Sequence, residues 1–267
     1  MLIRLAGASL RAAMVATVVV VPALMLPDVS TSAEELAIIA AALAAAFVIF
    51  EYGFQTPSLI EFRFAAPYNR FRFAMFAAVL VALTLAFRPT IHDTGASILL
   101  TQMAQSSLAA WDFAGSPVRA FMTLTGAMDD TARTLVATAA ALAITVTVAT
   151  MLVFAAIMTF FSWPLSRDTF NLWINIPTFD ANLGEDAQAA LRQSAFMSVL
   201  IGLTLPYLAP QAALAFMGPL EPVSPGNSLI LVWMIAIWCF VPAATLLRAV
   251  ALYRVAHLLA LENVSEG

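Results

Sequence analysis

The sequence has no lysine, one cysteine and two histidines, and these absences exclude several classes of protein. All twelve strongly basic side chains are arginines, and sixteen acidic residues bring the formal charge to −4. A nucleic-acid-binding protein needs a basic surface to neutralise phosphates, so we expect no nucleic-acid partner. The single Cys239 excludes an intramolecular disulfide and a cysteine-based metal cluster. We interpret it as a small buried apolar residue.

The residue types that most often carry catalysis are also few. His92 and His257 fall on opposite sides of the membrane in the topology derived below, so they are not expected to share a metal or a proton relay. The sequence contains no Gly-rich phosphate loop and no recognisable pair of nucleophile and base. We therefore predict no catalytic residue, no metal site and no cofactor, although an enzymatic role stays open.

Charge of either sign is scarce, and long apolar runs take its place. Charged residues make up 10% of the 267 residues and hydrophobic residues 62%, whereas a typical soluble domain has roughly 25% and 45–50%. The apolar residues form runs separated by short polar segments, which is the pattern of repeated membrane crossings. We predict one all-α, polytopic membrane domain over residues 1–267. Its six predicted spans are residues 12–26, 36–50, 73–87, 135–161, 195–217 and 229–247.

The first apolar run has two interpretations. It is short enough to be the apolar region of a signal peptide, with small residues at 31–33 for cleavage. However, Pro27 and Asp28 end the run and the next one begins almost at once, which fits a hairpin of two helices at least as well. We predict that residues 1–33 are retained.

The second and third runs are short for a bilayer. Each has fifteen residues, which gives about 22 Å of helix against a hydrocarbon core of about 30 Å. Flanking aromatic residues and snorkelling arginines would have to complete these spans. Helices that need such help are expected to have protein neighbours.

The three later spans carry local signals of their own. Asp129 and Asp130 are predicted to cap the fourth helix, because their side chains can accept hydrogen bonds from free amides at a helix start. Pro206 and Pro210 predict a kink in the fifth helix. The sixth helix is predicted to continue as an amphipathic helix to Leu261. Threonines of the fourth span are expected to bond to their own helix or to a neighbour, namely Thr138, Thr145, Thr147, Thr150 and Thr159.

The arginines give the orientation of the chain. Six crossings place nine arginines on one side (4, 11, 63, 70, 72, 167, 192, 248 and 254) and three on the other (88, 119 and 133). Because cytoplasmic loops of membrane proteins carry the excess of arginine and lysine, both termini are predicted to be cytoplasmic. The expected location is a bacterial cytoplasmic membrane.

The external segment between the third and fourth spans is too apolar for a simple connector. Ile98 to Leu100, Met103, Leu108 and Trp111 fit one face of a helix that lies on the membrane. A second short helix is predicted from about Pro117. The alternative is a re-entrant pair, which would need surrounding protein to satisfy its backbone.

The first cytoplasmic loop, residues 51–72, is dense in aromatic and charged side chains. Ser58 and Glu61 have the spacing of a capping box, which predicts a short helix from Ser58. Its aromatic rings are expected at the level of the lipid headgroups, while its arginines reach phosphates or carboxylates. We interpret the loop as an interfacial anchor or as a docking surface for a partner or ligand.

The second cytoplasmic loop adds aromatic rings and amides between Trp163 and Asp180. Amides beside rings suit recognition of a protein or a headgroup, and they are also common at membrane interfaces. Since both loops lie on one predicted side, they can converge into one surface. The candidate interaction residues are Glu51, Tyr52, Glu61, Arg63, Tyr68, Asn69, Arg70, Arg72, Asn171, Trp173, Asn175 and Asp180.

Three functions stay open on this sequence. Arg11 and Glu51 lie at the ends of predicted spans, and no other arginine, aspartate, glutamate or histidine falls inside a span, which disfavours transport of charged substrates. The leading hypothesis is a non-enzymatic accessory, assembly or interaction subunit of a membrane complex, with the bilayer and a protein partner or oligomer around it. The first alternative is a transporter or channel for a small neutral or amphiphilic solute, motivated by the prolines of the fifth span. The second is a lipid-active enzyme using Glu51, Glu61, Arg63 and Asp180.

Overall fold

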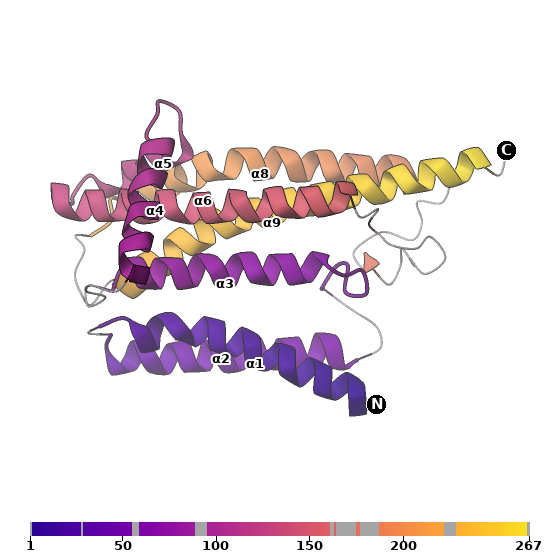
Figure 1. The fold of residues 1–267 in the computed structure, drawn as a ribbon, viewed down its shortest axis with the longest axis horizontal. Helices are drawn as coiled ribbons and strands as arrows, with labels where there is room; N and C mark the ends of the chain where they lie inside the picture. The colour runs from indigo at the N-terminus through magenta and orange to yellow at the C-terminus, as the bar shows by residue number, and fades with distance from the viewer. Residues whose placement is uncertain are drawn as a thin grey trace.

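Six long helices run roughly along one axis of the computed structural model (Figure 1). The structure describes residues 2–27, 29–54, 59–88, 95–160, 163, 175–176, 187–221 and 228–265. The long helices are α1 (Leu2–Met25), α2 (Thr31–Gly53), α3 (Tyr68–Ala86), α6 (Asp130–Phe160), α8 (Ala187–Met217) and α9 (Ser228–Ser265). The short ones are α4 (Gly95–Trp111), α5 (Pro117–Met122) and the 3₁₀ helix η1 (Thr123–Thr125). Within the described ranges there is no strand, and six helices are long and apolar enough to cross a membrane. The predicted all-α polytopic fold is therefore confirmed.

Both termini lie at the same end of the bundle (Figure 1). We call this the terminal end; residues 59–67, between α2 and α3, also lie there. The opposite end carries α4, α5 and the segment after α8, where the Leu220 amide donates to the Leu124 carbonyl at 2.7 Å. The even number of crossings predicted from the sequence therefore agrees with the arrangement of the six long helices.

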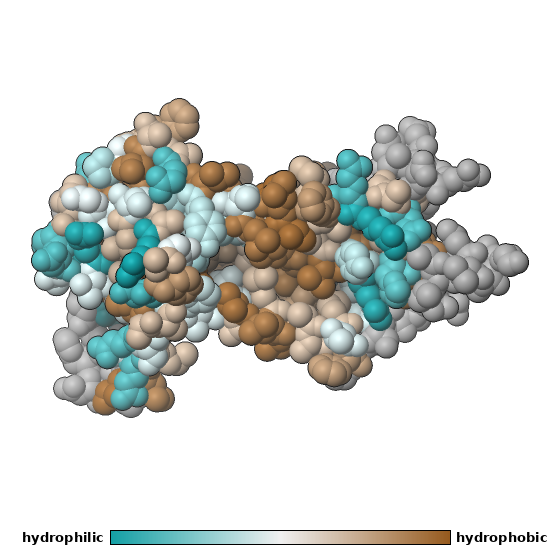
Figure 2. All heavy atoms as spheres, turned by 90° about the horizontal axis from the view of Figure 1, so that it is seen from above, coloured by the Kyte–Doolittle hydropathy of each residue, from teal (hydrophilic) through white to brown (hydrophobic). Residues whose placement is uncertain are grey.

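The outer surface of the bundle is apolar around its middle. Figure 2 shows a band of hydrophobic side chains between two ends that are richer in polar ones. Large apolar side chains are exposed along the spans, with relative exposures of 66% for Leu43 and Leu152 and 61% for Leu208. Such a surface would be unfavourable in water and is stable in a bilayer.

Small residues let the central helices approach closely. On α6, Ala139, Ala140, Ala141 and Ala143 are at most 1% exposed. On α8, a Cβ atom added to Gly202 would lie 2.6 Å from Cγ of Leu246 on α9. This close approach is typical of membrane helices, which pack by van der Waals contact rather than by the hydrophobic effect.

The helices α2 and α3 are longer than the apolar runs that predicted them. They have 23 and 19 residues, which gives about 34 and 28 Å of helix. The two fifteen-residue apolar runs are thus extended by flanking helical residues, which add the missing length. An uncharged run ends at the first charged residue, whereas charged residues are good helix formers, so both helices continue past their apolar cores. On α2 the start is fixed by Ser30, whose hydroxyl accepts a hydrogen bond from the Ala33 amide.

The local predictions for α6 are confirmed. The Asp129 carboxylate accepts a hydrogen bond from the Ala132 amide at 2.7 Å and so caps the helix. Each of the predicted threonine hydroxyls donates to the carbonyl four residues before it, namely those of Thr138, Thr145, Thr147, Thr150 and Thr159. These hydroxyls are satisfied within the helix, as polar groups inside a membrane must be.

Helix α8 continues through Pro206 and Pro210 as one helix, Ala187–Met217. Pro210 has no N–H to donate to the carbonyl of Pro206. The indole Nε1 of Trp238 on α9 donates to that carbonyl instead, at 2.9 Å. The hydrogen bond that proline removes is thus replaced from a neighbouring helix. As predicted, α9 extends beyond its apolar part, to Ser265.

The external segment forms the two predicted helices. Helix α4 crosses the long helices at the opposite end rather than running beside them (Figure 1). Its Leu99 and Met103 are 61% and 52% exposed, whereas Leu108 and Trp111 pack on the core. Helix α5 begins at Pro117, with the Ser116 hydroxyl as its cap. This geometry favours an interfacial helix over a re-entrant one.

Candidate interaction site at the terminal end

The first loop folds into turns instead of the predicted helix. Residues 61–64 are a turn, and Phe62 has a φ of 55°, in the left-handed region that a non-glycine residue rarely adopts. Residues 59–67 are therefore not helical, and Ser58, the other half of the predicted capping box, lies outside the described residues. The physical reason is that the carboxylate of Glu61 is bound elsewhere.

Glu61 forms a two-pronged ion pair with Arg248 of α9. The guanidinium Nε lies 2.7 Å from Oε2, and Nη2 lies 2.8 Å from Oε1. The third nitrogen, Nη1, donates to the hydroxyl of Ser198 on α8 at 3.0 Å. Glu61 is 8% exposed, and bidentate pairs of this kind fix orientation as well as charge. One arginine thus joins the first loop to two spanning helices.

The two loops are joined by direct hydrogen bonds. The Phe62 amide donates to the Asn175 backbone carbonyl at 2.5 Å, and the Phe64 amide donates to the Asn175 side-chain oxygen at 3.2 Å. The Trp163 indole donates to the Ala66 carbonyl at 3.0 Å. The predicted convergence of the two loops is confirmed for these residues. We refer to residues 59–67 with Trp163, Asn175 and Ile176 as the platform.

Aromatic rings fill the interior of the platform. The ring centroids of Phe62 lie 4.7 Å from Tyr68 and 5.6 Å from Trp163. Tyr68 in turn lies 6.0 Å from Phe154 on α6. All four side chains are at most 1% exposed. Arg254 of α9 adds a hydrogen bond from Nε to the Trp163 carbonyl at 3.0 Å, so the platform packs firmly on α3, α6 and α9.

A second set of contacts fixes the chain where it leaves α2. Glu51 is 2% exposed, and its Oε2 accepts hydrogen bonds from the Leu59 and Ile60 amides at 3.3 and 3.2 Å. Arg63 donates to the backbone carbonyls of Glu51 and Phe54. Burial lowers the pKa of Arg63, and the charge of Arg4 lowers it further, while Glu51 and Tyr52 oppose the shift.

The predicted interaction residues are split between the interior and the surface. Those in the interior are Glu51, Glu61, Tyr68 and Asn175. Those partly exposed are Tyr52, Arg63, Asn69 and Arg72, and Arg70 is exposed. Asn171, Trp173 and Asp180 lie outside the described residues, as does His92. Much of the predicted surface is therefore scaffold that holds the remainder in place.

The sequence reasoning missed Arg248 and Ser198 as parts of this site. Arg248 is the first charged residue of α9, and a charge at the end of a span signals a need for a partner. That signal could have identified Arg248. The sequence holds no comparable signal that its partners are Glu61 and Ser198.

The contacts of this site suit a structural role better than a catalytic one. Both carboxylates of the first loop are engaged in structural contacts, Glu51 with backbone amides and Glu61 with Arg248. Among the described residues, no three His, Cys, Asp or Glu side chains come close enough together to hold a metal ion.

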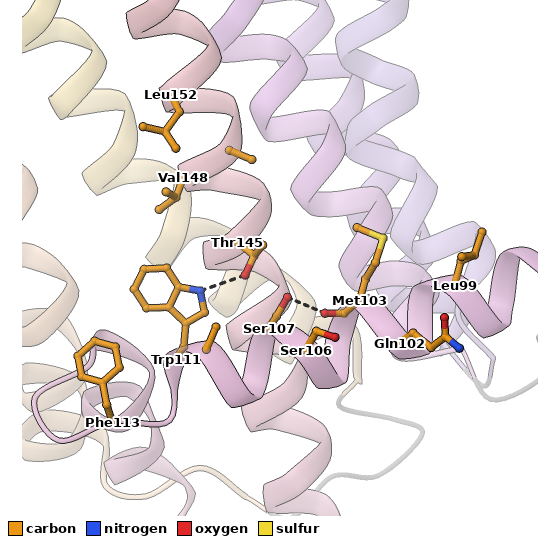
Figure 3. A pocket seen from close by; sticks show the side chains of 12 residues that line it. Leu99, Gln102, Met103, Ser106, Ser107, Trp111, Phe113, Thr145, Val148 and Leu152 are labelled. Carbon is orange, nitrogen blue, oxygen red and sulfur yellow. Dashed lines mark hydrogen bonds between the residues drawn. The ribbon is translucent and has the colours of Figure 1, made fainter.

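The opposite end carries an open groove between α4 and α6 (Figure 3). Its volume is about 740 Å³, and Leu99, Met103, Val148 and Leu152 give it a largely apolar lining. At its base, the Trp111 indole donates to the Thr145 hydroxyl at 3.0 Å. A second hollow of about 560 Å³ lies on another side of α4. Neither of these two hollows is lined by the prolines of α8.

Comparison with known proteins gives no further guide to the function. The chain matches no known protein family, no curated protein and no solved structure. The fold class is therefore established by the helices themselves, and the function has to be argued from the contacts of the platform.

Proposed function

We propose that this chain is a non-enzymatic subunit of a complex in a bacterial cytoplasmic membrane and that it binds a protein partner through the platform. The observation that carries the proposal is the interlock of the two loops through Asn175 and Trp163. A pre-organised surface loses less conformational entropy on binding than a flexible one. A buried ion pair is costly to assemble and gives little net stability, so a role in fixing one loop conformation is its best rationale.

The outer side of the platform carries residues suited to such a contact. Leu59 and Phe64 are 63% and 61% exposed, and Arg70, six residues after Phe64, is also exposed. Exposed aromatic and apolar side chains with an arginine at the rim are the composition of a protein interface. The partner we propose has an apolar patch with a carboxylate at its edge.

The orientation is part of the proposal. The terminal end carries the arginines that the positive-inside rule places in the cytoplasm. A partner of the platform is then a cytoplasmic protein or a cytoplasmic loop of another membrane subunit.

In-cell photo-crosslinking tests this function. A photo-reactive phenylalanine analogue at position 64 should crosslink to a partner in a discrete product, and the same analogue at position 98, on the exposed face of α4, should not give that product. Arg70→Glu should lower the yield at position 64 by about tenfold, since it replaces attraction to a carboxylate with repulsion. The matched control is Arg133→Glu, because Arg133 is an exposed arginine at the opposite end. This substitution should leave the yield unchanged.

Two results would contradict the proposal. One is the absence of any protein product at position 64 in cells that express the chain at its natural level. The other is an equal loss of product for Arg70→Glu and Arg133→Glu.

The contacts of α8 give less support to the transporter alternative. That alternative expects a cavity near Pro206 and Pro210. Pro210 is buried, and the Pro206 carbonyl is occupied by Trp238. The observations therefore favour the docking role.

A further inference from the structure

Two arginines flank one tyrosine at the terminal end, where α1 meets α2, and two more act on this group through their charges. The guanidinium carbon of Arg11 lies 4.9 Å from the centroid of the Tyr52 ring, and that of Arg63 lies 5.9 Å from it. The charge of Arg72 also acts on Tyr52, and the charge of Arg4 acts on Arg63. These arginines come from α1, the first loop and α3, so the fold itself brings them together.

The cluster carries an excess of positive charge. Among the described residues, Glu51 is the one carboxylate that acts on Tyr52 or Arg63. Its Oε2 is already bound to the Leu59 and Ile60 amides. The cations of the cluster repel one another, and at the edge of a low-dielectric bilayer that repulsion is weakly screened. An anion among them would relieve it.

Several guanidinium groups of the cluster keep donors for such an anion. Arg11 reaches back along α1 and donates from Nη1 to the Gly7 carbonyl at 2.8 Å, which leaves its other N–H groups exposed. Gly7 permits this conformation, because a Cβ atom there would lie 3.0 Å from Nη1. Nε of Arg72 is buried and has no hydrogen-bond partner within the described part of the chain. Guanidinium groups bind phosphate oxygens in pairs, with a geometry that matches their planar fork.

Exposed apolar side chains lie beside the arginines. Phe50 and Phe54, at the end of α2, are 57% and 58% exposed, and their ring centroids are 4.7 Å apart. Leu5 of α1 is 37% exposed and packs near Gly53. A soluble phosphate would leave these side chains uncovered. The acyl chains of a lipid would cover them.

We propose that this cluster is a binding site for one anionic phospholipid. The phosphodiester lies beside Arg4 and Arg11 of α1, and the acyl chains run along α1 and α2 past Leu5 and Phe54. The site goes beyond the docking role of the platform and does not depend on it, because Arg4 and Arg11 are on α1 and take no part in the interlock of the loops.

Native mass spectrometry of the full-length protein in mild detergent tests the site. The probes are dioleoyl phosphatidylglycerol, which is anionic, and dioleoyl phosphatidylcholine, which has the same chains and no net charge. The protein should retain the anionic lipid about tenfold better than the neutral one. Arg11→Gln should weaken retention of the anionic lipid about fivefold and leave retention of the neutral lipid unchanged.

The matched control is Arg192→Gln. Arg192 is an exposed arginine near the start of α8, and α8 lies on the side of the bundle away from α1 (Figure 1). The Arg192→Gln protein should retain the anionic lipid as well as the natural protein does. Unchanged thermal unfolding of both variants would show that the comparison concerns binding rather than folding.

Three outcomes would overturn the site. The first is equal retention of the two lipids by the natural protein. The second is an equal loss for Arg11→Gln and Arg192→Gln, which would indicate general charge attraction. The third is displacement of the anionic lipid by millimolar inorganic phosphate, which would indicate a site for a soluble anion.

Discussion

Glu61 and Arg248 are separated by 187 residues in the sequence and are joined in the structure by two hydrogen bonds of 2.7 and 2.8 Å. The pair joins the first loop to α9, and the bond from Arg248 to Ser198 extends the connection to α8. This contact therefore ties the platform to both helices.

Removing one partner of this pair should be far more costly than removing both. Glu61→Ala leaves a partly buried guanidinium without its carboxylate and should lower the free energy of unfolding by about 3 kcal/mol. The double variant Glu61→Leu with Arg248→Met should recover most of that loss, because neither charge is then left unpaired. Unfolding in detergent, followed by circular dichroism, measures both. A double variant as unstable as Glu61→Ala would show that the pair is not the source of the effect.

The stability cost of losing the hydrogen bond from Trp238 to the Pro206 carbonyl should depend on Pro210. Trp238→Phe removes the donor and should cost about 1–2 kcal/mol, since the carbonyl is left without a partner. In a Pro210→Ala background the residue at 210 supplies its own N–H to that carbonyl, so the same substitution should cost clearly less. Trp233→Phe, on the same helix, is the control for loss of indole packing. Equal costs in the two backgrounds would refute this role for Trp238.

The contact between α8 and α9 should not tolerate a larger residue at Gly202. A Cβ atom there would lie 2.6 Å from Leu246 and 2.8 Å from Thr245, so Gly202→Ala should destabilise the protein by about 1–3 kcal/mol. Gly126→Ala is the matched control, because a Cβ atom at position 126 has no neighbour within 4 Å. The thermal unfolding midpoint should fall for the first variant and stay within error for the second. A stable Gly202→Ala protein would mean that the two helices are farther apart than described.

The orientation of the chain can be tested with single cysteines. The native Cys239 is buried, so background labelling should be low. Phe113→Cys, between α4 and α5, should react with a membrane-impermeant maleimide in intact spheroplasts. Arg70→Cys should react only after permeabilisation. The reverse pattern would place the termini outside and would refute the topology predicted from the arginines.

The parts of the structure that were predicted correctly from the sequence depend on nearby residues. The Asp129 cap and the threonine hydrogen bonds of α6 join atoms within four residues of each other. The spans were located correctly because apolar runs of this length have one favourable environment. Helices α2 and α3 extend beyond the predicted spans, because residues such as Glu51 after the second apolar run and Arg72 before the third are also helical.

The organisation of the platform was not predictable in the same way. The helix expected from Ser58 relied on Glu61 as a local cap, but a stronger partner, Arg248, takes its carboxylate. Asn175 was identified as a candidate by its residue type, whereas its hydrogen bonds to residues 62 and 64 depend on how the chain returns after α6. Tertiary contacts of this range override local patterns, and a single sequence does not contain them.

The central claim is that the interlock of the two loops prepares a surface for a partner. Asn175→Ala removes the side-chain acceptor of the Phe64 amide, and it should raise amide hydrogen exchange in residues 59–67 without changing exchange in α6. The most direct test combines this substitution with the photo-crosslinker at position 64. If the platform is a pre-organised docking surface, Asn175→Ala should lower the crosslinking yield severalfold, because the partner must then order the loop on binding. A yield that stays unchanged while the loop exchanges faster would contradict the claim.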